Sequence, residues 1–231
     1  MEISVRADVQ DAIRQLRLIG SEVVPKAAAA ALNDTAFEGR RAAQEEMKQV
    51  FDRPTRWTLN APWVEKARSS NLVSVVNLQG KAYKSTDAYA YLNPQIEGGP
   101  RPAKRSEKLL RARGILPAGM FVVPGAGARI DSHGNMSRGQ MQQILAQVRA
   151  HFDPHQRTPQ GRGTEYFHAI LGGTNGIWRR RAGGVVPVLV FVKQPRYRVR
   201  LRFYALVQRV VDRSWRANFE REISARLRRG Y

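Results

Sequence analysis

Apolar residues recur at three-, four- and seven-residue steps from Pro25 to Phe51, and this period predicts one long amphipathic helix. Pro25 fits the first turn of a helix, and Pro54 ends the run because the residue before a proline avoids α geometry. The apolar face is built from small side chains, with Gly39 near its middle, so we expect another helix or a sheet to approach it closely. That face contains Ala28, Leu32, Ala36, Ala43, Met47 and Val50.

A second helical pattern closes the chain, from Phe203 to Arg228, and we expect this helix to pack with the first. A shorter helix is predicted before the first one, capped by Asp8 and closed by Gly20, after a short strand over Ile3–Val5. The apolar stripe of the last helix contains Leu206, Val207, Val210, Val211, Trp215, Phe219, Ile223 and Leu227.

Between the long helices the apolar period shortens to two residues, which is typical of strands. Trp63–Arg68 and Leu72–Leu78 lie on either side of the turn residues Ser69–Asn71, and together they predict a hairpin. Ala88–Leu92 predicts a further strand, and the apolar run Val185–Val192 predicts a buried one. The resulting fold class is α+β, in which the two long helices pack on a mainly antiparallel sheet that includes Val185–Val192.

The middle of the chain, residues 98–180, is rich in Gly, Pro and Arg and has few long apolar runs. We interpret it as an insertion projecting from one core domain. Residues 1–97 then supply the N-terminal helices and hairpin of that domain, and residues 181–231 supply its last strand and helix. Within the insertion, Ser137 is a good N-cap for a helix, and His151–Gly163 is expected to be a flexible loop.

Positive charge dominates the composition, with 39 Lys+Arg against 19 Asp+Glu and a formal net charge of +20. Such an excess indicates a polyanionic neighbour or acidic partner subunits. The chain has no cysteine, which excludes disulfides and thiolate metal sites. The N-terminus lacks the apolar segment of a secretory signal, and no apolar run is long enough to span a bilayer, so we expect a soluble, cytoplasmic protein.

The segment PRYRVRLRF alternates arginines with apolar residues, which places four guanidinium groups on one face of an extended chain. At ~3.3 Å per residue the strip would be about 20 Å long. It is suited to phosphates or to an acidic partner surface, and the alternative is a solvated edge strand whose charge prevents aggregation. The basic character of the whole chain favours an interaction. The predicted contact residues are Arg196, Arg198, Arg200 and Arg202, opposite Tyr197, Val199, Leu201 and Phe203.

Candidate metal ligands are sparse. His151 and His155 have H-x₃-H spacing, but Pro154 between them disfavours the helix that would align the two rings. The nearby carboxylates, Asp153 and Glu165, complete no known metal pattern. Two solvated histidines in a loop are the expected reading, and a metal-dependent nuclease is a weak alternative.

Catalytic and nucleotide-binding patterns lack their usual context. Asp131, Ser132 and His133 are adjacent in sequence, yet no G-x-S-x-G nucleophile elbow is present. The GAG at 125–127 and the GG at 172–173 lack the strand, glycine-rich loop and helix that a phosphate site needs. We therefore predict no enzyme, no cofactor and no resident metal.

Several stretches resemble a phage family. VPKAAAAALNDTA is similar to the start of the lambda-type minor tail protein Z family, also called tail-completion proteins. GIWRRR followed by PVLVFVKQPRYRVRLRF and an amphipathic helix is similar to the end of such prophage proteins. GGPRPAKRSEKLL and GNMSRGQMQQILAQ resemble their middle segments.

The resemblance implies a structural virion protein at the head-proximal end of a long non-contractile tail, joining it to the head–tail connector. It implies no catalytic residues. The expected partners are further copies in a ring, the tail terminator or tail tube, connector proteins and genomic DNA in the lumen, and no membrane. The expected location is the virion neck, after assembly in the host cytoplasm. The alternatives are a sequence-independent nucleic-acid-binding protein and, less favoured, the nuclease.

Overall fold

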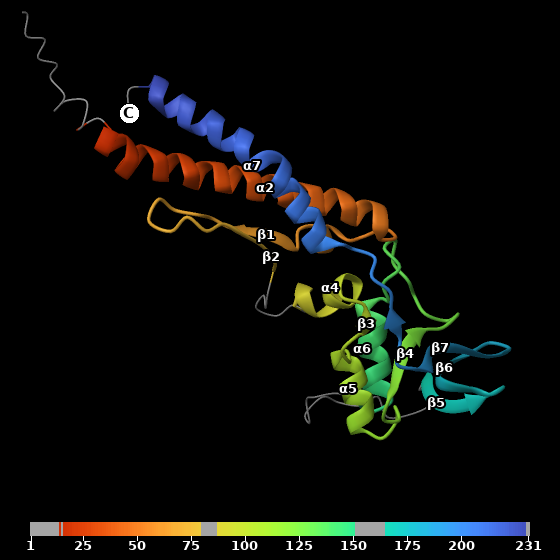
Figure 1. Ribbon diagram of the computed structural model, residues 1–231. Helices are drawn as coiled ribbons and strands as arrows, with labels where there is room; N and C mark the ends of the chain where they lie inside the picture. Colours follow the sequence, from red (N-terminus) through yellow and green to blue (C-terminus); the bar gives the residue numbers. More distant parts are fainter. Residues whose placement is uncertain (1–13, 15, 80–86, 151–164, 230–231) are drawn as a thin grey trace, which may run out of the picture. The chain divides into compact units, whose positions relative to one another are not determined.

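The computed structural model describes residues 14, 16–79, 87–150 and 165–229 (Figure 1). The chain divides into two compact units. Unit 1 comprises Met1–Tyr89 and Leu201–Tyr231, and unit 2 comprises Ala90–Arg200. Long helices and antiparallel sheets make up the described residues, which confirms the predicted α+β class.

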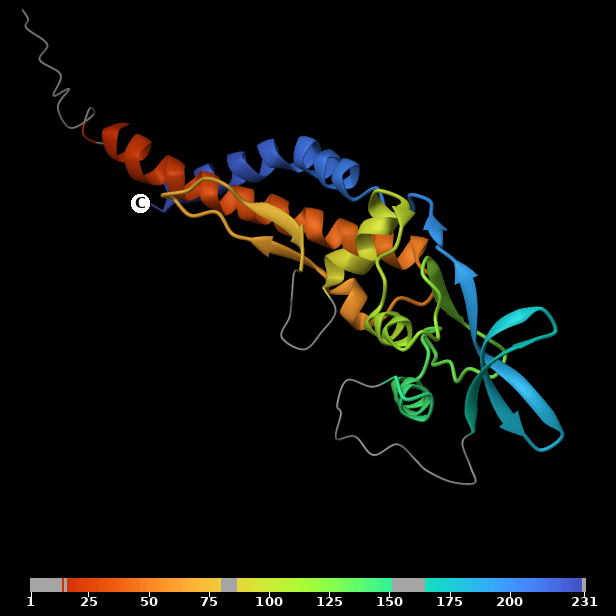
Figure 2. The same cartoon turned by 90° about the horizontal axis from the view of Figure 1, so that it is seen from below.

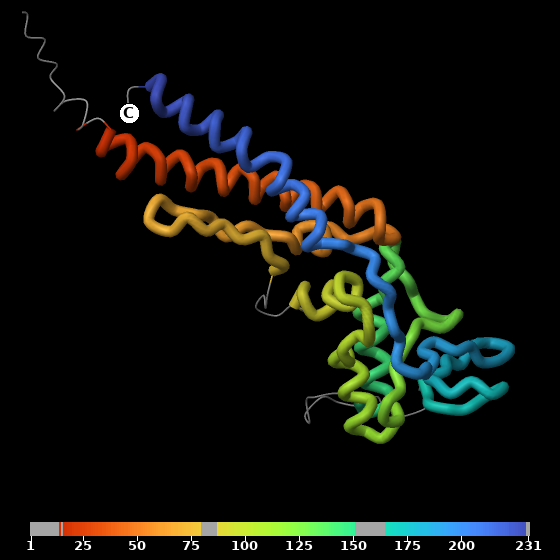
Figure 3. The backbone as a smooth tube through the Cα atoms, viewed as in Figure 1, coloured from red at the N-terminus to blue at the C-terminus, as the bar shows by residue number. Residues whose placement is uncertain are grey.

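Unit 1 is organised around two long helices, α2 (Val24–Val50) and α7 (Phe203–Arg228), which run side by side in opposite directions (Figures 1 and 3). Both predicted helices are confirmed, and Pro25 lies in the first turn of α2. The expected break at Gly20 is wrong, because α2 follows directly on a π-helical segment, η1 (Ile19–Val23). A helix-closing glycine usually adopts a positive φ, which Gly20 does not. The predicted cap at Asp8 and the strand over Ile3–Val5 lie outside the described residues.

The predicted hairpin is confirmed as strands β1 (Pro62–Glu65) and β2 (Val75–Leu78), which pair antiparallel beside α2 (Figure 2). The short helix α3 (Arg56–Leu59) precedes it. A Cβ added to Gly39 would lie 3.5 Å from Val207 of α7 and 3.7 Å from Val76 of β2. The small-residue face of α2 therefore admits both a helix and a hairpin, as its composition predicts.

A polar seam joins the two long helices. Asn218 of α7 is buried, and its amide nitrogen donates to Thr35 Oγ1 at 3.0 Å and to Glu38 Oε1 at 3.1 Å. Arg221 donates to Asn218 Oδ1 at 2.7 Å and to Asp34 at 2.6 Å. In the predicted apolar stripe of α7, by contrast, only Val210 is buried. The helix pair is therefore fixed in register by hydrogen bonds as well as by apolar packing.

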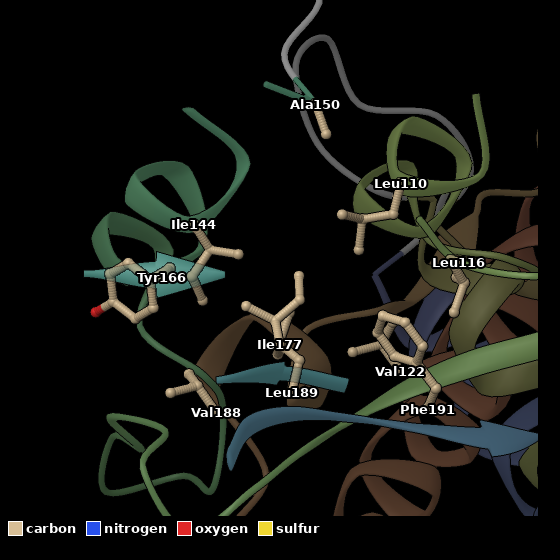
Figure 4. Close-up of a cluster of buried hydrophobic side chains, with 10 residues drawn as sticks. All are labelled: Leu110, Leu116, Val122, Ile144, Ala150, Tyr166, Ile177, Val188, Leu189 and Phe191. Carbon is tan, nitrogen blue, oxygen red and sulfur yellow. The ribbon is translucent and has the colours of Figure 1, made fainter. Parts of the chain in front are cut away.

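Unit 2 contains a four-stranded antiparallel sheet in the order β4-β7-β6-β5. The helices α5 (Arg105–Ala112) and α6 (Arg138–Gln147) contribute Leu110 and Ile144 to the core cluster that this sheet lines (Figure 4). Ser137 caps α6, as predicted, by accepting a hydrogen bond from Gln140 N. The strands are β4 (Met120–Pro124), β5 (Tyr166–Leu171), β6 (Thr174–Arg181) and β7 (Gly184–Lys193).

The segment that follows the hairpin, at the boundary between the two units, differs from the sequence expectation. Ala88–Leu92 belongs to a helix, α4 (Ala88–Ile96), and not to a strand. Asp87 Oδ1 accepts a hydrogen bond from Tyr89 N, a side-chain cap that starts a helix and that the alternation of Ala and Tyr conceals. After α4, the two-residue strand β3 (Gly99–Pro100) pairs antiparallel with β8 (Arg196–Tyr197).

The boundaries of the units also differ from the expected domain limits. Val185–Val192 is a strand, as predicted, but it lies in β7 of unit 2, where Val188, Leu189 and Phe191 join the cluster of Figure 4. The sheet beside α2 is the β1–β2 hairpin. The predicted insertion at 98–180 thus belongs to a compact unit with its own core, spanning residues 90–200. The expected flexible loop at His151–Gly163 lies outside the described residues.

Candidate nucleic-acid or acidic-partner interface

The predicted arginine row runs from β8 (Arg196–Tyr197) to the residue before α7. Arg196 opens β8, and Arg200 N donates to Gln95 O at 2.8 Å, which ties Arg200 to α4 within unit 2. Only two residues of the segment form a strand, whereas the alternation predicts an extended strand over the whole arginine row. Arg202 belongs to unit 1, at the residue before α7. All four arginines, Arg196, Arg198, Arg200 and Arg202, are exposed.

The apolar side of the row is divided. Leu201 is fully buried and Phe203 is 3 % exposed, which agrees with the predicted alternation. Tyr197 is half-buried and Val199 is 51 % exposed, so these two residues depart from the predicted alternation. The two buried residues, Leu201 and Phe203, anchor the end of the segment, and Arg202 between them stays exposed.

Most of the excess charge resides in unit 2. Residues 90–200 contain 18 of the 39 Lys+Arg and 5 of the 19 Asp+Glu, a net charge of +13 out of +20. Unit 2 is therefore the more basic of the two units. Apart from the row, its exposed cations include Arg105, Lys108, Arg113, Arg129, Arg138 and Lys193.

The carboxylate of Glu107 is fully buried and cannot neutralise that surface. Arg101 donates to both of its oxygens, at 2.9 and 2.6 Å. Lys104 N donates to Oε2 at 2.7 Å, which caps α5, and Val122 N donates to Oε1 at 2.9 Å, which ties α5 to β4. Burial raises the pKa of Glu107, but the hydrogen bonds from Arg101, Val122 and Lys104 outweigh it and hold that pKa below its ordinary value.

Two other carboxylates of unit 2 are also engaged. Glu165 forms an ion pair with Arg179, which joins the start of β5 to β6. Asp131 Oδ1 accepts hydrogen bonds from Asn135 N and His133 N, and these hold the pKa of Asp131 below its usual range. Among the described residues of unit 2 this leaves Glu97 as the exposed carboxylate with no such role. Asp131 and Glu97 are therefore the exposed carboxylates among the described residues of unit 2, and the exposed cations of the unit outnumber them.

Some cations have structural roles and are poor candidates for partner contact. Arg101 and Arg111 each lie 4.9 Å from the centre of the Phe121 ring, and Arg111 also donates to Met120 O at 2.5 Å. Arg180 lies 4.1 Å from the Phe167 ring centre. A partner-binding surface on unit 2 would therefore consist of the arginine row and exposed cations such as Lys108, Arg129 and Lys193.

The other sequence candidates do not converge on a reacting centre. Asp131 closes a turn with Ser132 and His133, so the three residues shape a loop. Within the described ranges there is no group of three His, Cys, Asp or Glu residues that would hold a metal ion. His151, Asp153 and His155 lie outside those ranges, so the structure does not test the nuclease alternative.

The glycine pairs serve the sheet of unit 2. Gly125 N and Gly127 N donate to Val188 O and Pro187 O of β7, and an added Cβ on Gly125 would lie 2.5 Å from Pro187 O. Gly172 and Gly173, with φ of +54° and +75°, form the tight turn between β5 and β6. Both patterns are explained by backbone geometry.

Sequence reasoning missed the Glu107 network, although one signal was available. A glutamate three residues into a helix is the position from which a side chain reaches back to the N-cap N–H. The segment K-R-S-E places Glu107 there relative to Lys104. Its contacts with Arg101 and Val122 have no local signal, because they join α5 to other parts of unit 2.

Comparisons with protein-family models, with curated proteins and with solved structures found no match. Among the described helices, none combines the length and the apolar character needed to cross a membrane.

Proposed function

We propose that the protein is a structural component of a phage virion: a tail-completion or minor tail protein at the head-proximal end of a long non-contractile tail. There it joins the tail to the head–tail connector. The observation that carries the proposal is the concentration of positive charge in unit 2, where exposed cations outnumber exposed carboxylates among the described residues. A neck protein meets both acidic protein surfaces and packaged DNA, and either would be attracted to such a unit.

The resemblance to the lambda-type minor tail protein Z family supplies the particular role. It rests on the start of α2, on the segment from β6 to α7, and on parts of unit 2 between them. The proposed partners are further copies of the chain, the tail terminator or tail tube, the connector proteins, and DNA in the lumen. The proposed location is the virion neck, with no catalytic activity and no cofactor.

The second candidate is a sequence-independent nucleic-acid-binding protein, and the same charge favours it. The two functions differ in what the isolated chain does. A nucleic-acid binder shifts free DNA with a steep dependence on salt, because each phosphate contact releases counterions. A neck protein instead associates with tail and connector subunits. A nuclease would require a divalent metal and would lose activity on His151→Ala.

The test is a fourfold Arg→Gln variant at positions 196, 198, 200 and 202. These side chains are exposed, and exposed charges contribute roughly 0–1 kcal/mol each to stability, so we expect a nearly unchanged melting temperature. We expect the variant to fail in completing tails that lack the wild-type protein. The control removes four exposed arginines of unit 1 and lowers the net charge equally: Arg41, Arg56, Arg68 and Arg209.

Normal tail completion by the fourfold variant would assign the row to a solvated edge and overturn its proposed role. If completion fails, DNA binding by the isolated variant separates the remaining readings. Lost DNA binding together with a reduced salt slope indicates contact with phosphates, and unchanged DNA binding indicates an acidic protein surface. A direct view of the role comes from imaging a virion neck in which this subunit carries a label.

A further inference from the structure

The β2 side of the hairpin in unit 1 exposes apolar residues within a stretch of 11 residues that carries no charge. Residues 69–79 contain no Asp, Glu, Lys or Arg, in a chain that is 25 % charged. Within this stretch Leu72 is 45 % exposed, Val73 57 % and Val75 38 %. Trp63 of β1 is also exposed. Clustered exposed apolar side chains on a soluble unit mark a surface that another molecule covers.

The backbone of β2 is open along one edge. Among the described residues, β1 and β2 form a sheet of two strands, so each has one strand partner. Gln79 N donates to Ala61 O in the same register, which directs the backbone groups of Asn77 and Val75 towards β1. The backbone groups of Val76 therefore point to the outer edge.

The two edges of the hairpin are not equivalent. On β1, the outward position opposite Leu78 is Pro62, which has no N–H to donate, and the charged Glu65 and Lys66 follow. Proline and charge are the usual devices that prevent pairing at a sheet edge. Residues 72–79 of the β2 side contain neither, so β2 is the edge available for strand addition.

The distribution of charged residues indicates which kind of molecule could pair with the β2 edge. An acidic partner would be recognised by cations, and residues 69–79 contain none. Two copies of a chain with net charge +20 repel each other over most of their surface. That repulsion is weakest where residues 69–79 face each other, because neither copy brings a charged side chain from this stretch.

We propose that β2 is a self-association strand, which pairs antiparallel with β2 of a second copy across a two-fold axis. The two hairpins then form one four-stranded sheet in the order β1-β2-β2-β1, and the exposed side chains of Leu72, Val73 and Val75 pack on their symmetry mates. Such a contact is isologous and closes as a dimer. It is independent of the proposed role in a virion.

The oligomeric state of the full-length protein, measured by sedimentation across a wide range of concentration, tests the proposal. We expect the wild type to dimerise and Val75→Lys to be monomeric, because the two-fold axis brings both new lysines into one contact. Val75→Glu alone should also be monomeric, and an equimolar mixture of the two variants should regain the dimer by pairing opposite charges. The control Val185→Lys places the same change at an exposed valine of unit 2 and should leave dimerisation intact.

Circular dichroism melts of all variants check that each substitution leaves the folding of the chain unchanged. A wild type that stays monomeric would overturn the proposal, as would a Val75→Lys variant that still dimerises. If both charged variants are monomeric but their mixture does not associate, β2 does not face itself and the two-fold arrangement is wrong. Loss of tail completion by a Val75→Lys variant whose oligomeric state matches the wild type would assign the strand to a different protein.

Discussion

The buried carboxylate of Glu107 provides the most direct test of how unit 2 is held together. Replacing it by glutamine keeps the size and shape of the side chain but removes the charge. The glutamate accepts two hydrogen bonds from Arg101 and one each from the backbone N–H groups of Lys104 and Val122. A glutamine has one acceptor oxygen, and its amide group would face donors. The substitution therefore leaves the Arg101 guanidinium, which is itself largely buried, without its counter-charge.

The expected loss of stability follows from the hydrogen bonds that are lost and the charge that is left unpaired. Removing one partner of a buried ion pair typically costs about 3–5 kcal/mol, because the remaining charge is left uncompensated. A loss of that size in a unit of this length lowers the melting temperature by at least about 10 °C. Replacing both partners, as in Arg101→Met with Glu107→Leu, should cost less than the sum of the single changes, since no charge is then stranded.

The assay is urea unfolding combined with hydrogen exchange, because the chain has two units and a single melting curve mixes them. We expect Glu107→Gln to raise exchange in peptides covering α5 and β4 and to leave α2 and α7 unchanged. The control is Glu97→Gln, the same chemical change at an exposed position of the same unit, with an expected effect within roughly 0.5 kcal/mol. If Glu107→Gln costs no more than this control, the network does not stabilise unit 2 and the reasoning fails.

Three further outcomes are expected. Folding lowers the pKa of Glu107, so the ionised carboxylate contributes its full stabilisation above the unfolded-state pKa of about 4.3. This stabilisation declines as the pH falls towards the folded-state pKa. In urea titrations, the difference in unfolding free energy between the wild type and Glu107→Gln should therefore narrow over that acidic range. Gly176→Ala should destabilise unit 2 by roughly 3 kcal/mol, because its Cβ would lie 2.2 Å from Leu189 O, whereas Gly139→Ala, in an open position of α6, should not lower stability in the same assay. Asn218→Ala should cost roughly 1–3 kcal/mol, seen as faster exchange in α2 and α7, because buried partners lose their hydrogen bonds.

Features encoded within a few residues could be predicted from the sequence. The helix α2 ends at Val50, shortly before Pro54 as predicted, and the start of α6 follows from Ser137, whereas Pro25 does not begin a helix because helical residues precede it. The hairpin followed from alternation around turn residues, and Gly39 correctly marked a close approach. Where two local signals competed, as in α4, the side-chain cap by Asp87 decided the outcome over the alternation.

The candidate interface was predictable in part. The exposure of the four arginines follows from charge, since guanidinium groups are seldom buried without partners. The length of the strand did not follow, because a strand requires a neighbour, and β8 finds only Gly99 and Pro100 to pair with. The sequence also gave no indication that Arg101 and Arg111 would pack on Phe121 and leave the set of exposed cations.

The sequence by itself determined the elements of this protein: two long helices, a charge-free hairpin strand, an apolar β7 and a strongly basic middle. Period, caps and prolines act over a few residues, so their consequences are local. Only the tertiary structure decided that β7 builds a separate core with Leu110 and Ile144, and that Glu107 is buried beneath a basic surface. Those choices depend on how side chains distant in sequence fill one volume and satisfy each other's hydrogen bonds, which no single stretch of the chain encodes.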